Sequence, residues 1–318
     1  MADLPTLPQR AGALLIKDLI DLYMAHYAGK DPTRLQRLAW WAARVGEIAL
    51  QDLSDDDVHA ALEDLAGQRS RFFAGKDADG RPIHKARRKP IAPATVNRYN
   101  ASLAAVLTWS IKRRIAPKAY VHPCRAIERR PEHNEKTRFL SDVEREALLA
   151  ACKASQWPRL YLVVLMALTT GARRSELLGL RWRDIDFERA LAHVGQTKNG
   201  DPRVLPLVPA VLDELRRFEG AASTMIFPSS RQPAPGQPAR PFTFELRWQA
   251  ALQEAKIKNF RFHDLRHSCA SMLAQNGATL LEIGDLLGHR QLQVTKRYSH
   301  LATGHKAALV NRVLGGIR

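Results

Sequence analysis

The segment Arg261–Ala270, RFHDLRHSCA, contains two histidines four residues apart with an arginine between them. On a helix, this spacing puts the imidazoles of His263 and His267 on one face. Three interpretations fit the pair: a metal site, two packed core histidines, or part of a site that holds a negatively charged group. The residues around the pair help to discriminate between them.

The neighbours of the pair argue against a metal. In the zinc-protease pattern H-E-x-x-H, a Glu follows the first histidine and acts as base, whereas this chain has Asp264. The Arg266 guanidinium would repel a divalent cation, and the sequence offers no obvious third ligand. A phosphate suits these residues better, because arginine presents a planar fork to two oxygens and histidine adds a further donor.

A phosphoryl transition state carries more negative charge than its ground state, so several cations must converge on it. Arg173 follows Gly171, where an apolar helix predicted over residues 160–168 gives way to the next helix. Glu176, three residues farther on, is spaced to orient Arg173. Lys198 directly precedes Asn199-Gly200, which is a strong signal for a hairpin turn.

The C-terminal part adds His289, just past a predicted helix end at Gly288, and Tyr298 nine residues later. With these two residues, the ordered set resembles the tyrosine recombinase family, the phage-integrase type of site-specific recombinase. The resemblance covers about residues 137–300. The matching motifs are T-G-x-R at Thr170–Arg173, S-E at Ser175-Glu176, Lys198, H-x-L-R-H at His263–His267, L-G-H at Leu287–His289, and Tyr298.

The resemblance implies a mechanism. Tyr298 attacks a DNA phosphodiester to give a 3′-phosphotyrosyl intermediate, His263 accepts the phenol proton, and Lys198 protonates the departing 5′ oxygen. A 5′ hydroxyl from another strand then completes recombination. The residues expected to bind the non-bridging oxygens are Arg173, Arg266 and His289. The side chains expected to support the site are Glu176 and His267.

No cofactor or metal is implied, since cationic side chains neutralise the phosphate. Taken singly, these residues have simpler explanations. An Arg and a Glu three apart on a helix are usually a surface pair, and a lysine beside a turn is normally solvated. Tyr298 alone would fit a core or a surface position, and Arg174 is interpreted in this simpler way. The ordered combination is what favours catalysis.

Composition agrees with a polyanionic partner. The 318 residues include 49 Lys and Arg against 32 Asp and Glu, a net charge of +17. Nucleic acid and an anionic membrane surface both qualify as such a partner. The longest apolar stretch, Leu160–Leu168, is too short to cross a bilayer, and no membrane partner is expected beside the DNA. The odd number of widely spaced cysteines, Cys124, Cys152 and Cys269, suggests reduced thiols and a cytoplasmic protein.

The fold class expected is mainly α with a small antiparallel β-sheet. Residues 1–116 are predicted to form a helical DNA-binding domain without strands, which resembles the family's core-binding (SAM-like) bundle. Residues 117–136, rich in proline and charge, are predicted as a linker, and residues 137–318 as an α+β catalytic domain. Capping boxes are expected at Ser141 and Thr279.

The segment Ser70–Pro90 is expected to be a loop, either solvated or acting as a basic arm that grips a phosphate backbone. Its candidate DNA contacts are Lys85, Arg87, Arg88 and Lys89. The two domains suggest a clamp around double-stranded DNA at a specific recombination site. The family resemblance implies a homotetramer on two DNA sites, with an excisionase or host factor as a further partner.

The apolar residues of the C-terminal tail, Leu309, Val310, Val313 and Leu314, suggest either docking on a neighbouring subunit or packing on their own domain. Two other functions remain open. A type IB topoisomerase would share the chemistry but relax supercoils without exchanging strands. A DNA-binding regulator would not need the intact Arg-Lys-His-Arg-His-Tyr set.

Overall fold

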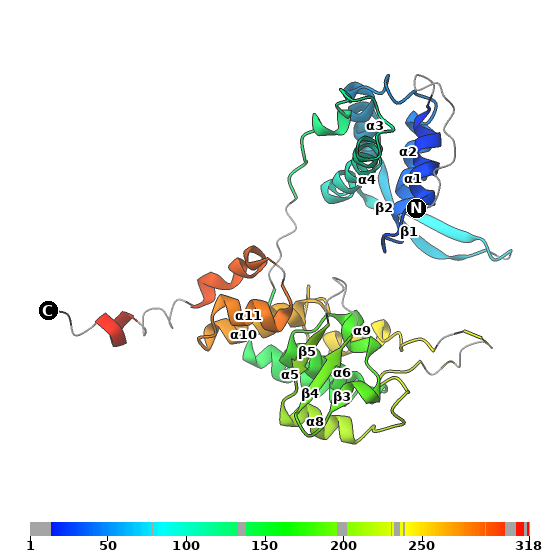
Figure 1. The fold of residues 1–318 in the computed structure, drawn as a ribbon. Coiled ribbons are helices and arrows are strands. Elements are labelled where there is room, and N and C mark those ends of the chain that lie inside the picture. The colour runs from blue at the N-terminus through cyan, green and yellow to red at the C-terminus, as the bar shows by residue number, and fades with distance from the viewer. Residues whose placement is uncertain are drawn as a thin grey trace. The chain divides into compact units, whose positions relative to one another are not determined.

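The structure is a computed structural model, and the chain divides between Asn134 and Glu135 into two compact units (Figure 1). Each unit has its own hydrophobic core. The residues that the structure describes are 14–77, 79–132, 138–195, 202–229, 231, 236–237, 239–289, 291–302, 310–314 and 317.

The first unit is built on four helices, α1 (Ile16–Ala25), α2 (Arg34–Val45), α3 (Asp55–Gly67) and α4 (Pro93–Lys112). Each helix buries one apolar stripe, as on α2, where Leu38, Trp41 and Val45 face the core. The predicted stripe of α4 is also confirmed, since Val96, Leu103, Val106 and Ser110 are buried. These buried stripes form the hydrophobic core that the four helices share.

The basic segment between α3 and α4 is a β-hairpin, which corrects both the expected loop and the strand-free bundle. Strand β1 (Arg69–Lys76) pairs antiparallel with β2 (Pro82–Pro90), with Phe72 opposite Lys85. The described side chains of both strands are largely exposed, so the strands lack the apolar alternation of a half-buried sheet. Asp79-Gly80, near the tip, is the local turn signal that the sequence does carry.

The predicted linker is also corrected, because most of it belongs to the first unit. A 3₁₀ turn, η1 (Pro123–Arg125), lies against α4 and buries Cys124 in the core. The side chain of Asn97 on α4 accepts from the Arg130 N–H (3.0 Å) and donates to the Arg130 carbonyl (2.8 Å). Proline and charge in this segment therefore mark an irregular but packed backbone.

The second unit surrounds one apolar helix, α6 (Leu160–Thr170), which is confirmed as central because almost every residue in it is buried. Helices α5 (Asp142–Lys153), α7 (Arg174–Gly179), α8 (Pro209–Arg216) and α10 (Asp264–Gln275) contact it. The remaining elements are α9 (Glu245–Glu254), α11 (Leu280–Leu287) and two 3₁₀ segments, η2 (Trp182–Asp184) and η3 (Leu292–Ala302). The predicted capping boxes at Ser141 and Thr279 are present.

A three-stranded antiparallel sheet completes this unit, in the order β3 (Ile185–Asp186), β4 (Leu191–Val194) and β5 (Arg203–Pro206). The strands on either side of the predicted Asn199-Gly200 turn pair with each other, with Val194 opposite Arg203. The turn and Lys198 lie outside the described residues. The expected class, mainly α with a small antiparallel sheet, is confirmed. Within the described part of the chain, no helix is both long and apolar enough to cross a bilayer.

Two motif glycines end helices beside each other. Gly171 caps α6 at φ 61°, and Gly288 caps α11 at φ 64°, both in the left-handed region that favours glycine. A Cβ on Gly171 would lie 2.3 Å from the Leu287 side chain. The C-terminal ends of α6 and α11 can therefore approach each other only because position 171 has no side chain.

We expect Gly171→Ala to lower the free energy of unfolding of the second unit by about 2 kcal/mol or more, since it adds both backbone strain and a clash. Urea denaturation followed by circular dichroism measures the change. Gly179→Ala is the matched control, because nothing lies within 4 Å of its added Cβ. Equal stabilities for the two variants would contradict the close approach of the helix ends.

Candidate active site

A cavity of about 540 Å³ opens in the second unit where α10, the end of α11 and η3 meet. It gathers five of the six residues predicted to be catalytic, although they are spread over more than a hundred positions of the chain. The residues that line it are Arg173, His263, Arg266, His267, Gly288, His289, Gln291, Val294, Arg297 and Tyr298. This described lining contains no Asp or Glu, so the cavity is suited to an anion.

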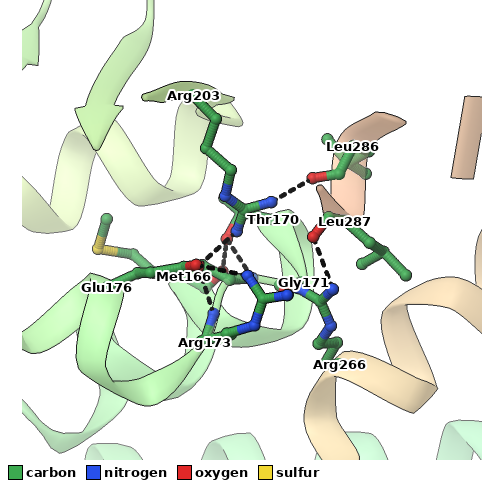
Figure 2. A network of polar contacts seen from close by, with 10 residues as sticks. Met166, Thr170, Gly171, Arg173, Glu176, Arg203, Arg266, Leu286 and Leu287 are labelled. Carbon is green, nitrogen blue, oxygen red and sulfur yellow. Dashed lines mark hydrogen bonds and ion pairs between the residues drawn. The ribbon is translucent and has the colours of Figure 1, made fainter. Parts of the chain in front are cut away.

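Arg266 lies on α10 and joins the two helix ends described above (Figure 2). Its Nη1 donates to the Gly171 carbonyl at 2.7 Å, and its Nη2 donates to the Leu287 carbonyl at 2.6 Å. Carbonyls at helix C-termini lack partners within the helix and carry partial negative charge. A buried guanidinium satisfies both, and its remaining N–H donors are left for a ligand in the cavity.

Arg173 is the N-cap residue of α7, and a buried carboxylate fixes its position. Glu176 Oε1 accepts from Arg173 Nη1 at 2.7 Å, and Oε2 accepts from the Arg173 backbone N–H at 2.8 Å. The same Oε2 accepts from Nη2 of Arg203, at 2.6 Å. Figure 2 shows Glu176 between the two guanidinium groups. The expected contact between Glu176 and Arg173 is present.

Charge and burial shift the pKa values of this network. Burial lowers the pKa of Arg266 to about 10, and the positive charges of Arg173 and Arg203 act in the same direction. Burial alone would raise the pKa of Glu176, but the hydrogen bonds from Arg173 and the charges of Arg203 and Arg173 bring it below its usual value. Glu176 is therefore ionised at neutral pH and partly offsets the repulsion between the arginines.

The hydroxyl of Tyr298 contacts a histidine on α10. The Tyr298 side chain lies on η3 and is 1% exposed, and its hydroxyl lies 2.6 Å from Nδ1 of His267. The family resemblance implies that His263 accepts the phenol proton, whereas the contact of the hydroxyl is with His267. His263 is the residue before α10 begins, and its ring lies edge-on to that of His267, with 5.4 Å between centroids. The predicted neighbourhood of the two histidines is present, but His267 is the one at the hydroxyl.

His289 follows the Gly288 cap, and its Nδ1 lies 2.8 Å from the hydroxyl of the buried Thr295. Burial lowers the pKa of His289 to about 4, helped by the charge of Arg266. Burial likewise lowers the pKa of His267 to about 4, and lowers that of His263. All three imidazoles are therefore neutral at pH 7 in the free protein. If the Thr295 hydroxyl donates to Nδ1, the Nε2–H of His289 can donate to an anion.

The other predicted site residues fall into two groups. Lys198 lies outside the described residues. The four basic residues of the hairpin are exposed in the first unit, and Lys85 lies opposite Phe72 across the two strands. The Arg87 guanidinium lies 5.5 Å from the centre of the Phe72 ring.

Two arginines in or behind the cavity were not identified from the sequence. Arg297 lines the cavity next to Tyr298, and its positive charge lowers the pKa values of Tyr298 and His289. Arg203 lies behind the cavity, where it pairs with Glu176. The sequence contains one indication of this residue, because Arg203 begins the strand that follows the predicted hairpin turn. Among the described residues, no three His, Cys, Asp or Glu side chains form a group that could hold a metal.

Residues 138–305 match the model of the phage integrase family. The integrase of Salmonella phage P22 is 27% identical over 298 residues, which span 88% of this chain and 74% of that protein. The shufflon-specific DNA recombinase of Escherichia coli is 34% identical over 143 residues, 45% of this chain and 35% of that protein. The type 1 fimbriae regulatory protein FimE of E. coli is 31% identical and is matched over 92% of its length.

Solved structures share the fold. The Tn1549 transposon integrase, in complex with a circular intermediate DNA, superposes with a TM-score of 0.68 at 17% identity, over 93% of this chain and 99% of that one. A lambda integrase dimer bound to a core site gives 0.64 at 16% identity, over 91% and 78%. Since the family model matches more than half of the sequence, the chain belongs to the phage integrase family, that of the tyrosine recombinases.

Proposed function

We propose that this chain cuts and rejoins double-stranded DNA at a specific site through a 3′-phosphotyrosyl intermediate, and so integrates or excises a mobile element. The observation that carries the proposal is one cavity lined by Tyr298, Arg173, Arg266 and His289, with no carboxylate on the described lining. The chemistry is a phosphoryl transfer without cofactor, in which fixed cations replace a metal.

In the first step the Tyr298 oxygen attacks the scissile phosphorus, and the bond to the 5′ oxygen breaks. Arg173, Arg266 and His289 donate to the non-bridging oxygens, whose negative charge is largest in the transition state. Lys198 gives a proton to the departing 5′ oxygen. Attack of a 5′ hydroxyl from another strand reverses these events. The energy of the broken bond stays in the phosphotyrosine, so no nucleotide is consumed.

The phenol proton passes to His267 in this proposal, because a neutral imidazole lies at hydrogen-bonding distance from the hydroxyl. Burial raises the pKa of Tyr298, against the lowering effects of Arg297 and Arg266, so the free enzyme holds its nucleophile protonated. His263 also lines the cavity, and in this proposal it is a further donor to the phosphate of the substrate. This assignment replaces His263 by His267 as the first proton acceptor.

The substrate is duplex DNA, and the solved relatives named above are described as integrases bound to DNA. We propose that the hairpin of the first unit contacts phosphates through its exposed basic residues, Lys85, Arg87, Arg88 and Lys89. Exposed basic side chains supply the salt-dependent part of DNA affinity. The exposed Phe72 adds apolar area beside Lys85 and Arg87.

The assembly is a homotetramer on two DNA sites in the cytoplasm, with an excisionase or host factor setting direction. The tail after Tyr298 supports contacts between subunits, because Val310, Val313, Leu314 and Ile317 are all 49% or more exposed in the single chain. This exposure favours docking on a neighbour over packing on the same unit. The relatives, among them integrases and a site-specific recombinase, favour recombination over topoisomerase or purely regulatory functions.

The central test uses a nicked suicide duplex that carries the chain's own recombination site. The wild type should form a covalent protein–DNA band that resists detergent, and Tyr298→Phe should form none, because the attacking oxygen is absent. Tyr161→Phe is the control, since this tyrosine lies on α6 away from the cavity. An adduct of normal yield with Tyr298→Phe would disprove the assigned nucleophile.

The neutral histidines predict acid sensitivity of the free protein. The pKa of His267 is lowered from 6.5 to about 4 on folding, so the unfolded chain takes up the proton first. The stabilisation is complete above pH 6.5 and is lost as the pH falls towards 4, by about 3 kcal/mol for this residue. Urea unfolding at several pH values measures it, and His267→Gln should flatten the dependence. An unchanged slope would show that His267 is not buried as a neutral ring.

The hairpin proposal predicts a change in salt dependence. Replacing Lys85, Arg87 and Lys89 together by Gln should reduce the slope of log affinity against log salt by roughly 0.9 for each lost phosphate contact. Arg189→Gln is the control, because this arginine lies outside the hairpin and its side chain is 80% exposed. Fluorescence anisotropy with the cognate duplex measures both. A wild-type slope for the triple variant would show that these three residues of the hairpin make no phosphate contacts.

A further inference from the structure

We propose that Arg203 is a positioning residue for the recombination reaction, which fixes Arg173 and the backbone before His289 relative to each other. The inference rests on the proposed function. Arg203 does not line the cavity in the described residues, so it is not placed to touch the DNA phosphate. It acts through the side chain and the helix end that it bonds.

The Arg203 guanidinium bridges two segments that are far apart in the chain. Nη2 donates to Glu176 Oε2 at 2.6 Å, and Nη1 donates to the Leu286 carbonyl near the end of α11, also at 2.6 Å. Figure 2 shows both contacts. The carboxylate of Glu176 in turn holds the backbone and side chain of Arg173. One fork therefore connects the carboxylate that positions Arg173 with the helix that leads to His289.

Arg203 is also closely packed against the backbone at Gly288. A Cβ on Gly288 would lie 3.2 Å from Cδ and 3.3 Å from Nη1 of Arg203, so the arginine lies against the backbone directly before His289. Its side chain is only 11% exposed. A displaced Arg203 would leave space beside the L-G-H turn, and His289 would lose part of the surface that fixes its position.

Arg203 and Arg266 hold the same helix end through adjacent carbonyls. Arg266, which lines the cavity, donates to the carbonyls of Leu287 and Gly171. Arg203, which does not line the cavity in the described residues, donates to the carbonyl of Leu286. The Nε atom of Arg203 is buried without a hydrogen-bond partner. Burying a guanidinium with an unpaired donor is unfavourable, so this residue is costly for the fold alone. A role in the geometry of the site accounts for the cost.

The chemistry requires arginine at this position. A planar fork can bond a carboxylate and a carbonyl at the same time, whereas the single ammonium of lysine is a point charge on a flexible stem. Lysine would keep the charge next to Glu176 but lose the fixed bridge to Leu286. Arg203 also begins β5, directly after the segment that contains Lys198. The bridge thereby anchors the strand that follows this predicted proton donor.

The test compares Arg203→Lys and Arg203→Met with the wild type in single-turnover formation of the covalent adduct on the suicide duplex. We expect the rate of adduct formation to fall about 100-fold in both variants, while the dissociation constant for DNA changes less than about threefold. Arg189→Met is the control, because this arginine lies between β3 and β4 and its side chain is 80% exposed.

A second substrate separates positioning from general damage to the fold. A neutral methylphosphonate at the scissile position removes one negative charge that Arg173 would stabilise. If Arg203 acts through Arg173, the loss caused by Arg203→Lys should be at least about tenfold smaller on this substrate, since less charge depends on the positioned cation. A structural defect would slow both substrates by the same factor.

Several results would overturn the proposal: wild-type rates for Arg203→Lys, equal losses on the two substrates, or loss of the folded state in both variants. The last result would assign Arg203 to the folding core. A wild-type enzyme that forms no adduct through Tyr298 would contradict the proposed function itself. Failure of the proposed function is recognised because the wild type itself gives no covalent product, whereas failure of the Arg203 proposal appears only when the variants are compared with an active wild type.

Discussion

The site depends on the meeting of two helix C-termini around one buried guanidinium. Arg266 donates to the last carbonyls at the ends of α6 and α11, and the absence of a side chain at Gly171 lets these ends approach. Both helix ends carry partial negative charge, and without the arginine their carbonyls would be buried unpaired. The guanidinium that bonds these two carbonyls also lines the cavity. Arg266 therefore contributes both to the packing of the helix ends and to the positive charge of the site.

The concentration of positive charge would be unfavourable without a compensating anion. Glu176 provides it from behind the cavity, between Arg173 and Arg203, with its side chain 1% exposed. Because this carboxylate does not line the cavity, it reduces repulsion between the arginines without competing with a phosphate at the lining. A preorganised site of this kind needs little rearrangement when negative charge develops on a substrate.

The proposed nucleophile, Tyr298, lies in a different environment from the cations. Tyr298 is nearly inaccessible, its pKa is raised by burial, and its hydroxyl contacts a neutral imidazole. A protonated, enclosed phenol is a poor nucleophile, so we expect the Tyr298 hydroxyl to be unreactive in the free chain. The approach of a phosphate to the arginines would change that balance, since it alters the charge that the phenol and His267 experience.

Much of this protein followed from local patterns in the sequence. The amphipathic helices, the apolar α6, the capping boxes and the glycine caps depend on residues within a few positions of each other, and such rules act over one or two turns. The motif spacing identified the family and most of the cavity residues. The exposed basic hairpin and the packed segment around Cys124 were missed, because neither carries a periodic apolar pattern.

Only the tertiary structure decided which side chains meet. His263 and His267 share a helix face, but the partner of the Tyr298 hydroxyl depends on how η3 packs against α10. His267 and Tyr298 are 31 residues apart in the chain. Arg203 looks like an ordinary strand arginine until β5 brings it to Glu176 and to the end of α11. The sequence determined the set of charged and nucleophilic groups, whereas long-range packing fixed their distances, and distances decide which group donates to which.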